Sequence, residues 1–561
     1  MMGRQTGTGA RRIEDCEAGH GGIGGAERAT RRRDWSRGRE ATVRIGRTIL
    51  AGLLVVVCLG LPAAVRGAPA PAPCPVKGGV LKFGLYRDPT GLDPHLNYGA
   101  TSSSLQGNVY DTLVNYDARG NIAPALAASW SQPQPTVYVF RLRRNVTFHD
   151  GTPFTAADVL YSFKRIMDPQ TKATRQKEYE QLVEAVRAQG DYTVEVRLRH
   201  PSATFLDVLA GRETFIVSKK WADAGGDFKK AMNGTGPFRL AGYEPNVRYV
   251  LERYPNAWDP ACLDRVELTP ILDDRARVNA LRSGQVDFVE YLPWQETESL
   301  LRERGFRVYR GFEVFNFIRL NPTRPPLTNP KVRQALNFAI NRNTVSLTAF
   351  GGQAQLMDGF LLRKDAWAYN PETSRVWKYD PPRALALLKE AGVARPQDLR
   401  LVLESANLTV HLDTAQVVAT MLRSFGATVE LRINDVATLF QKRVTGDYMM
   451  MMDGLSLPWA DPDFYYRYFH STGTAYAAAV KFKNDRLDQL LEEGQRITDR
   501  GRRKALYADV ERLLFQEAPW IFVVWRPQAE AGRSAVKGYV RLPGGLGAFS
   551  VGYMNRLWIE R

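Results

Sequence analysis

The chain has 561 residues, of which 44% are hydrophobic and 24% are charged, and no long low-complexity tract follows residues 1–74. This composition indicates a globular protein, and the length exceeds what one hydrophobic core supports, so two or three compact units are expected. The formal net charge is +17, but the basic residues do not form the aromatic-interleaved stripe typical of nucleic-acid-binding proteins. We therefore expect no nucleic-acid partner.

Residues 1–74 are predicted to be a leader that contains a signal peptide. Arg44 and Arg47 precede an uncharged stretch, Thr48–Val65, which is followed by an Ala-Pro-rich segment ending at Cys74. A basic region, an apolar region and small residues in this order are typical of a signal peptide, and cleavage is expected near residues 64–73. A transmembrane anchor is the alternative, but a stretch of 18 residues with two glycines and a proline is poorly suited to span a bilayer.

The leader carries two further hypotheses. Its first 40 residues are long and rich in Gly and Arg for a signal peptide, so the true start is hypothesised to lie at Val43. A lipid-attachment cysteine needs a small residue before it, whereas Cys58 follows three valines and Cys74 follows Pro73. A soluble periplasmic product is therefore expected rather than a membrane-anchored one.

Cys74 and Cys262 are the two cysteines of the expected mature protein. Disulfide bonds form in the oxidising space outside the cytoplasm, so these two thiols can pair after export. Two free, buried thiols are the alternative, and both interpretations stay open at this point.

Hydrophobic periodicity and turn residues predict the elements of the first half of the chain. Thr155 followed by Asp158 predicts a helix start, and Gly284 is a suitable residue to end a helix. Strands are expected at residues 77–86, 137–143, 146–148, 192–198, 238–243, 247–253, 286–288 and 315–321, and helices at 105–114, from 156 to 167, 177–189, 273–282 and 331–340.

A longer ordered pattern lies between Ala125 and Arg165. The segment ALAASW is followed by VFRLRRNVTFHDGTPFTAADVLYSFKR, in which an alternating strand, a turn at Asp150-Gly151 and a capped helix succeed one another. This string closely resembles the signature of the family 5 extracellular solute-binding proteins, the receptors of peptide, nickel and related ABC importers. The resemblance extends over nearly all of residues 77–561.

The resemblance implies an α/β, periplasmic binding protein-like two-lobe fold with an additional small domain and mixed sheets. Domain I would comprise residues 75–116, 225–316 and 520–561, domain II the insertion 117–224, and domain III residues 317–519. From residue 380 onwards strands alternate with helices, which predicts a parallel sheet. Helices are expected at 380–391, 414–425, 437–444, 484–496 and 502–517, and strands at 399–403, 428–433, 448–452 and 520–525, the last returning to domain I.

The resemblance also implies where a ligand binds. Residues 452–463 (MDGLSLPWADPD) are similar to the family's cleft segment G-W-x-A-D-Y-x-D-P. Carried over by position, the backbone of Gly454, Leu455 and Ser456 would contact an extended ligand as in strand addition, and Trp459 would form an aromatic wall. Asp461-Pro462 is interpreted as a turn. Further candidates for the cleft, each of which could equally be a core residue, are Tyr86, Tyr110, Trp294, Phe315 and Asn316.

The chain departs from the family where a peptide's two termini are recognised. Pro458 stands where peptide-binding members carry an Asp for the ligand's amino group, and residues 404–408 contain no basic residue for its carboxylate. A buried ligand charge without a partner costs on the order of several kcal/mol, so an ordinary dipeptide is disfavoured. Asp453 or Glu404 is the alternative amine partner, although such acids are more commonly solvated or structural.

These features predict a receptor rather than an enzyme. The histidines beyond the leader show no zinc-type spacing, no GxSxG motif is present, and His149-Asp150 lies in the predicted turn, where a structural role is expected. We expect no catalytic residue, cofactor or metal. The predicted function is a monomeric periplasmic receptor that captures a peptide-like or other small polar solute by lobe closure and delivers it to the permease and ATPase of an ABC importer. The alternatives are a ligand sensor or chaperone of the same fold without a transporter, and a secreted hydrolase.

Overall fold

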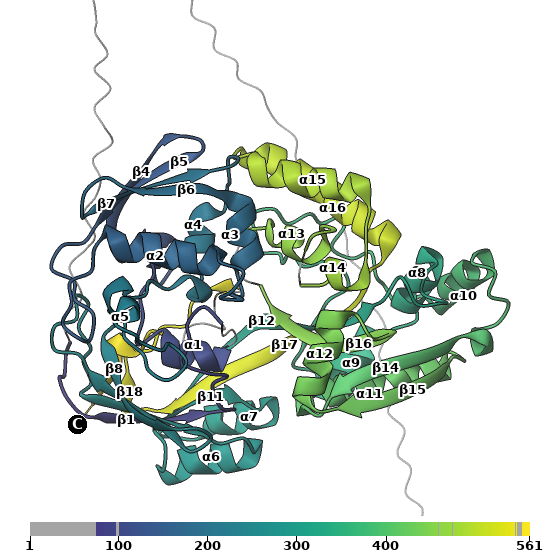
Figure 1. The fold of residues 1–561 in the computed structure, drawn as a ribbon. Coiled ribbons are helices and arrows are strands. Elements are labelled where there is room, and N and C mark those ends of the chain that lie inside the picture. The colour runs from purple at the N-terminus through teal and green to yellow at the C-terminus, as the bar shows by residue number, and fades with distance from the viewer. Residues whose placement is uncertain are drawn as a thin grey trace, which may run out of the picture. The chain divides into compact units, whose positions relative to one another are not determined.

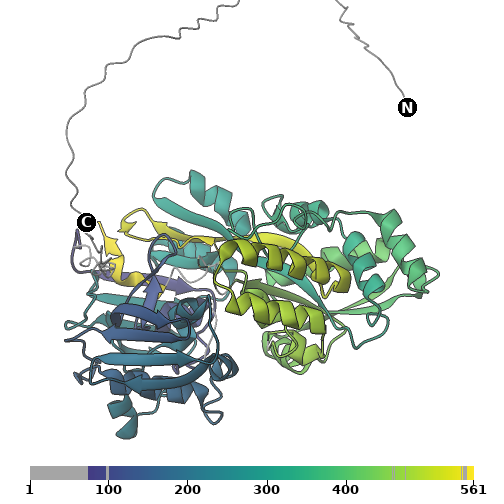
Figure 2. The ribbon, with the colours of Figure 1, turned by 90° about the horizontal axis from the view of Figure 1, so that it is seen from above.

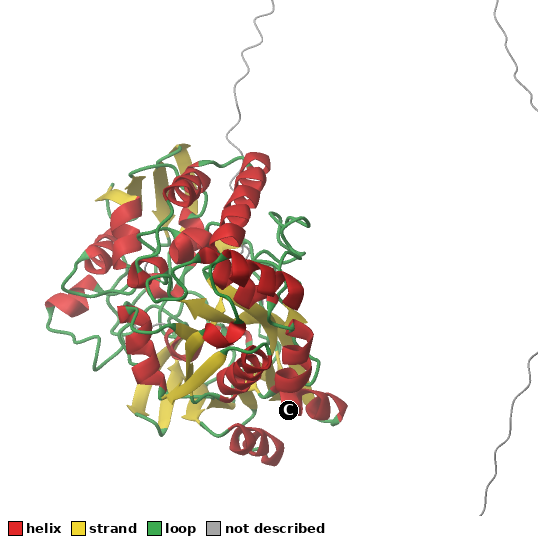
Figure 3. Ribbon diagram, turned by 90° about the vertical axis from the view of Figure 1, so that its right-hand side faces the viewer, coloured by secondary structure: helices red, strands yellow, loops and turns green. Residues whose placement is uncertain are grey.

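The structure, a computed structural model, describes residues 74–96, 100–457, 459, 461–473, 475–544, 546 and 552–560. The predicted signal peptide, the possible start at Val43 and the departure at Pro458 lie outside these residues. Helices and strands are mixed throughout the described part of the chain (Figure 3). Within these ranges, every helix is too short or too polar to traverse a lipid bilayer.

The largest sheet has 11 strands, some paired in parallel and others antiparallel. Its two longest strands, β12 and β17, lie side by side and pair over most of their length (Figure 1). The strands hydrogen-bond in the order β15 (Thr428–Asn434), β14 (Arg400–Ala406), β16 (Met450–Ser456), β12 (Phe306–Leu320), β17 (Trp520–Arg533), β11 (Phe288–Leu292), β1 (Val80–Leu85), β10 (Arg265–Pro270), β9 (Arg248–Arg253) and β8 (Phe238–Glu244), with β13 (Gln355–Leu356) added to β17.

β12 changes character along its length. Its last eight residues are all buried, whereas its first seven are half-buried or exposed. A strand covered on both faces carries a continuous apolar run instead of an alternating one, and the predicted strand at 315–321 corresponds to part of this buried half. The predicted boundary between domains I and III, at residues 316–317, falls inside β12, so the division into three domains stays a prediction.

A second sheet of four strands lies within the predicted insertion, residues 117–224. The alternation predicted for residues 137–143 is confirmed, because Tyr138, Phe140 and Leu142 are buried and Arg141 is exposed. Residues 146–148 form no strand; Thr147 makes only an isolated bridge to Pro153. The strands pair antiparallel in the order β4 (Ala127–Gln134), β5 (Val137–Leu142), β7 (Thr193–Leu198) and β6 (Val183–Ala188).

Helices α2 and α3 accompany this sheet. α2 (Ala156–Met167) lies against β6 and β7 (Figure 1), and it starts as predicted at Thr155, which forms a capping box with Asp158. The helix predicted over 177–189 is wrong in its second half. α3 (Gln176–Leu182) ends there because residues 183–188 pair with β7 as strand β6.

The helix predicted over 105–114 is also displaced. α1 spans Ala100–Gln106. The chain does not continue as a helix to residue 114, because the Val109 carbonyl, which a helix would bond to residue 113, accepts a hydrogen bond from Gly236 N at 2.9 Å. A Cβ on Gly234 would lie 1.9 Å from the same carbonyl oxygen, so the glycines of this turn allow the two backbones to approach closely.

The alternation predicted from residue 380 onwards is confirmed. β14 pairs in parallel with both β15 and β16. The connections between these strands are α11 (Thr409–Ser424), which follows β14, and α12 (Val436–Thr445), which follows β15. β16 then pairs antiparallel with β12, and β17 pairs antiparallel with β11, so the sheet as a whole is mixed.

Two of the other helices have end signals that can be seen in the sequence. α6 ends at Gly284, whose φ is 79°, and α8 begins after the capping residue Asn329 with Pro330 in its first turn. α15 and α16 lie side by side (Figure 2). The α-helices not described above are α4 (Phe205–Ala210), α5 (Lys219–Asp223), α6 (Asp274–Ser283), α7 (Trp294–Arg302), α8 (Pro330–Phe338), α9 (Arg342–Phe350), α10 (Pro381–Glu390), α13 (Phe464–Phe469), α14 (Ala477–Val480), α15 (Asp485–Arg496) and α16 (Arg500–Glu517). Short strands pair as β2 (Val114–Tyr116) with β3 (Ile122–Pro124) and as β18 (Val536–Lys537) with β19 (Trp558–Ile559).

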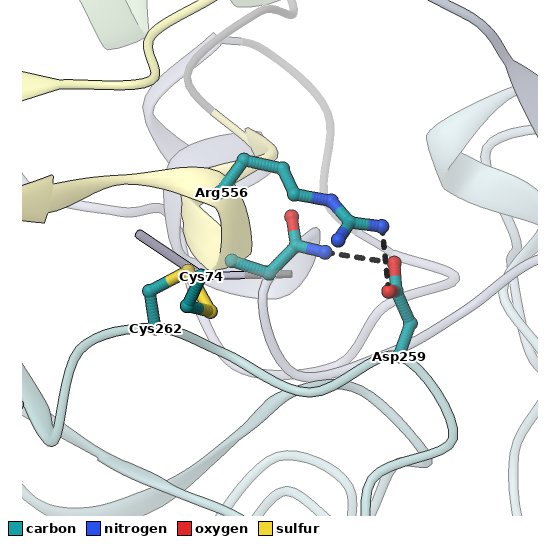
Figure 4. Close-up of a disulfide and its surroundings, with 5 residues drawn as sticks. Cys74, Asp259, Cys262 and Arg556 are labelled. Carbon is teal, nitrogen blue, oxygen red and sulfur yellow. Dashed lines mark hydrogen bonds and ion pairs between the residues drawn. A yellow bond between two sulfur atoms is a disulfide. The ribbon is translucent and has the colours of Figure 1, made fainter. Parts of the chain in front are cut away.

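Cys74 and Cys262 are joined by a disulfide bond, with their Cα atoms 5.4 Å apart. Close to this bond, the Asp259 carboxylate accepts hydrogen bonds from Asn555 Nδ2 at 2.8 Å and from Arg556 Nη2 at 2.7 Å (Figure 4). Cys262 N also donates to Asn555 O at 3.1 Å. The first described residues, the loop at 259–262 and the C-terminal segment are thus tied together.

Candidate functional site

The first turn of α11 is where several elements of the central sheet meet. A pocket opens beside it, which we call the α11 pocket. Three predicted ligand-binding residues lie at this place: Trp294 lines the pocket, and Asn316 and Gly454 contact the first turn of α11. The lining residues are Asp274, Tyr291, Leu292, Pro293, Trp294, Gln295, Thr409, Val410, Arg526, Pro527 and Gln528.

Asn316 attaches α11 to β12. Its Nδ2 donates to Val410 O and to Thr414 Oγ1, both at 2.9 Å. Its Oδ1 is buried and has no hydrogen-bond partner among the described residues. Since both hydrogens of the amide are used, this oxygen remains as an unused acceptor next to Gly454.

Gly454 is required by the position of His411. A Cβ at residue 454 would lie 2.6 Å from His411 Nε2 and 3.2 Å from Asn316 Oδ1. Burial lowers the pKa of His411 to about 4; the charge of Asp453 opposes this shift and that of Arg526 adds to it. The imidazole is therefore neutral near pH 7. Its Nδ1 is buried and finds no partner in the described part of the chain.

Arg526 is a cation in the lining of the pocket, contributed by β17. The residue is only 8% exposed, and its Cζ lies 5.0 Å from the centroid of the Tyr291 ring. Its Nε is buried without a hydrogen-bond acceptor, and the described residues form no ion pair with it. Burying a charge without a partner is costly, which makes Arg526 a candidate residue for binding an anionic ligand.

The end of β11, just before α7, forms an aromatic wall of the pocket. Tyr291 has a φ of 55°, a left-handed conformation that costs energy for a residue with a side chain. Arg277 Nη2 donates to its carbonyl at 2.8 Å and holds it in place. Its ring stacks on Tyr86, another predicted ligand-binding residue, with ring centroids 4.7 Å apart. Below them, Glu290 accepts from Ser104 Oγ at 2.6 Å, and burial raises its pKa.

The other predicted ligand-binding residues lie elsewhere. Tyr110, Phe315 and Trp459 are 1%, 0% and 3% exposed and belong to the hydrophobic core. None of the three is in the lining of the α11 pocket. That they contact a ligand therefore stays a prediction, and the alternative role as core residues accounts for their burial.

The predicted strand-addition edge is the end of β16. Gly454, Leu455 and Ser456 pair with β12 on one side. On the other side, the pairing of β16 with β14 ends at Met451, which pairs with Glu404 of β14. No described strand therefore covers residues 454–456 at that edge. That the backbone of these three residues binds an extended ligand is still a prediction.

The two alternative amine partners are bound to cations of the protein. Arg319 Nε lies 2.6 Å from Asp453 Oδ2, and Lys442 Nζ lies 2.9 Å from Glu404 Oε1. Burial works against ionisation of Asp453, but Arg319 and Arg443 outweigh it and hold its pKa below the usual value. Both acids thus have structural partners, which disfavours either as the receptor of a ligand amine.

The remaining polar motifs also have structural partners. Asp461 receives two hydrogen bonds from the Arg503 guanidinium, at 2.5 and 2.7 Å, which fasten the Asp461-Pro462 turn to α16. His149 Nε2 lies 3.0 Å from Gly236 O, and Asp150 accepts from Asn233 Nδ2 at 2.9 Å. In the described ranges, no group of three or more His, Cys, Asp or Glu side chains is arranged to hold a metal ion.

The sequence does not predict three residues at the start of α11: Tyr291 and Arg526, which line the pocket, and His411, which lies in the first turn of the helix. A weak signal existed for Arg526, because a charged residue directly follows the apolar strand Trp520–Trp525. Burial and lack of a partner, which make it a candidate, depend on residues far away in the chain. The spacing of His411 to other possible metal ligands predicts no metal site, and no other sequence pattern marks this residue.

Comparisons with known proteins give the family. Residues 121–477 match the model of the bacterial extracellular solute-binding proteins, family 5 Middle. The glutathione-binding protein GsiB of Pectobacterium atrosepticum is 26% identical over 511 residues, which cover 88% of this chain and 97% of GsiB. The di/tripeptide-binding protein 2 of Pseudomonas aeruginosa is 27% identical over 493 residues, covering 81% of this chain and 91% of that protein.

Solved structures agree with the fold. The PBP AgaA of A. tumefaciens R10, in complex with agropinic acid, has a TM-score of 0.81 and 28% identity, covering 86% of this chain and 99% of AgaA. The ABC transporter-associated periplasmic binding protein DppA of Helicobacter pylori, in complex with the peptide STSA, has a TM-score of 0.79 and 28% identity, covering 87% and 99%. The predicted α/β periplasmic binding protein fold with mixed sheets is confirmed. The relatives are binding proteins, and the family match spans more than half of the chain. This protein therefore belongs to family 5 of the bacterial extracellular solute-binding proteins, the solute receptors of ABC importers.

Proposed function

We propose that this protein captures a small, polar, peptide-like solute in the α11 pocket and delivers it to a membrane permease. The observation that carries the proposal is a set of buried polar atoms that lack partners among the described residues: Arg526 Nε, His411 Nδ1 and Asn316 Oδ1. Buried polar groups in folded proteins are nearly always hydrogen-bonded. The described residues hold such atoms elsewhere too, but three of them lie around the start of one helix. This grouping supports the proposal that a ligand supplies the missing partners.

The relatives support the class of solute. One is named for glutathione and another for di- and tripeptides, which are small molecules with peptide bonds and charged termini. The lining has the chemistry for such a solute, because aromatic walls from Tyr291 and Trp294 stand next to a few polar groups. In this form the cavity measures only about 10 Å³, so its walls have to separate to admit the solute. Asp453 and Glu404 are occupied by cations of the protein, so an unmodified dipeptide stays disfavoured at its amino end.

The mechanism we propose is capture by closure. β12 and β17 lie in the middle of the large sheet and connect its two ends. Bending of these two strands would bring the walls of the pocket together around a solute. Ligand binding favours the closed form only by the difference in affinity between the two forms. The closed form then docks, as a monomer, on the permease and ATPase complex.

We further propose the periplasm as its compartment, reached by means of a signal peptide within residues 1–74. The disulfide between Cys74 and Cys262 supports this, since disulfides persist in oxidising compartments. N-terminal sequencing of the exported protein tests the site of cleavage. A mature N-terminus outside residues 64–73 would contradict the expected position.

Native mass spectrometry tests the proposed function. Protein purified without denaturation from the periplasmic fraction should carry a small polar solute that is released on unfolding. Calorimetric titration with glutathione, tripeptides, amine-bearing oligomers and metal chelates then identifies the class. Uptake of the identified solute should depend on the gene for this protein. If a strain without the gene imported the solute normally, the protein would be a sensor and not the receptor of an importer. Recovery of a chemically altered solute would indicate an enzyme.

A further inference from the structure

One buried arginine differs from all other buried arginines of the described chain. Seven are at most 8% exposed: Arg175, Arg277, Arg319, Arg333, Arg342, Arg503 and Arg526. Five of them pair with a carboxylate. Arg342 has no such pair but donates to five backbone carbonyls. For Arg526 the described residues supply neither kind of partner.

The start of α11 adds positive potential at the same place. Thr409 and Val410, the first two residues of this 16-residue helix, line the pocket together with Arg526. The capping residue Leu408 has no side-chain acceptor for the free N–H groups of the first turn. Free N–H groups and the helix dipole both favour an anion at a helix N-terminus.

The lining does not neutralise this charge. Asp274 is the acid of the lining, and its Oδ1 already accepts a hydrogen bond from Arg277 Nη2. The ring of Tyr291 lies against the Arg526 guanidinium and leaves its edge for hydrogen bonding. A planar guanidinium edge matches a carboxylate, which it can bind through two parallel hydrogen bonds.

We propose that Arg526 and the first turn of α11 form a carboxylate subsite, and that the solute of this receptor is a carboxylate-bearing small molecule. The proposal rests on the proposed function and narrows its substrate class. Residues 404–408, at the end of β14, are where the family's dipeptide binders are expected to carry their basic residue, and they contain none. In this protein Arg526, on β17, would take the place of that basic residue. The carboxylate at a peptide's C-terminus would then be buried with a charged partner.

Calorimetric titration of the mature protein tests the subsite. The probes are trialanine, trialanine amide and glutathione, and the variants are Arg526→Met and the control Arg307→Met. Arg307 is exposed on β12 and forms no ion pair with the described residues. Wild type and R307M should bind trialanine at least tenfold more tightly than its amide. R526M should bind both with the same, weaker affinity.

The melting temperature provides a second readout. Without added probe, R526M should melt at or above the temperature of wild type, because an unpaired buried charge has been removed. A large drop in melting temperature would assign Arg526 a structural role and overturn the proposal. Equal affinity of wild type for trialanine and its amide would also overturn it, whether or not the variant folds.

Acetate separates this proposal from the proposed function. Sodium acetate should raise the melting temperature of wild type and R307M more than sodium chloride at equal ionic strength, and should not do so for R526M. If no peptide probe binds but the acetate effect depends on Arg526, the subsite stands and the peptide-like solute class fails. An acetate effect of equal size in all three proteins overturns the subsite.

Discussion

Replacing Asp453 with Asn should strongly destabilise the protein, because it removes the anion that holds a buried arginine. Arg319 Nε lies 2.6 Å from Asp453 Oδ2, and the two side chains are 1% and 10% exposed. Breaking a buried pair by removing one partner costs about 3–5 kcal/mol. Arg319 keeps one further hydrogen bond, to Ala475 O at 2.6 Å, so we expect a loss near the lower limit, about 3 kcal/mol.

The pH dependence of this effect has a definite sign. The pKa of Asp453 is lower in the folded protein than its usual value. Its contribution to stability is therefore present above the unfolded pKa of about 3.9 and is lost as the pH falls through the folded pKa. The difference between wild type and D453N should stay constant between about pH 8 and about pH 5 and shrink below about pH 4.

Urea unfolding followed by tryptophan fluorescence measures this difference. Asp447→Asn is the matched control, because Asp447 lies three residues before β16 and pairs with Arg324 at 3.1 Å, but the two side chains are 72% and 50% exposed. Exposed ion pairs contribute at most about 1 kcal/mol. If D453N and D447N had the same free energy of unfolding, the reasoning about the buried pair would be refuted.

Three further predictions concern the disulfide, a buried acid and a glycine. Cys262→Ser removes a bond between residues 188 positions apart; loop-closure entropy predicts a loss of about 5 kcal/mol, and a variant that melts together with oxidised wild type would contradict this. Burial raises the pKa of Glu511 to about 7, so the stability associated with its protonated form is lost as the pH rises from about 4.3 through about 7. The free energy of unfolding of Glu511→Gln, relative to that of wild type, should therefore rise by about 3 kcal/mol between about pH 5 and about pH 8 in urea titrations. A difference that does not change with pH would contradict the raised pKa of Glu511. Gly454→Ala would place a Cβ 2.6 Å from His411 Nε2 and should weaken solute binding about tenfold, whereas Gly242→Ala on β8, with nothing within 4 Å of the new Cβ, should bind as wild type does.

Most helices and strands could be predicted from the sequence because their signals are local. The capping box at Thr155, the left-handed Gly284 and the capped start of α8 depend only on neighbouring residues. The alternation of β5 likewise depends on side chains two positions apart. The family signature could be read for the same reason, since it is a continuous run of such signals.

The sequence by itself thus determined the α/β class and the family, and also the region around Gly454 in which to look for a site. Only the tertiary structure decided that residues 183–188 are a strand, because pairing with β7 outweighs their local preference for helix. Tertiary structure likewise decided that Tyr291, His411 and Arg526 meet at the start of α11. Burial and the lack of a charge partner among the described residues are properties of the packed chain, so no local pattern could mark Arg526 as a candidate ligand-binding residue.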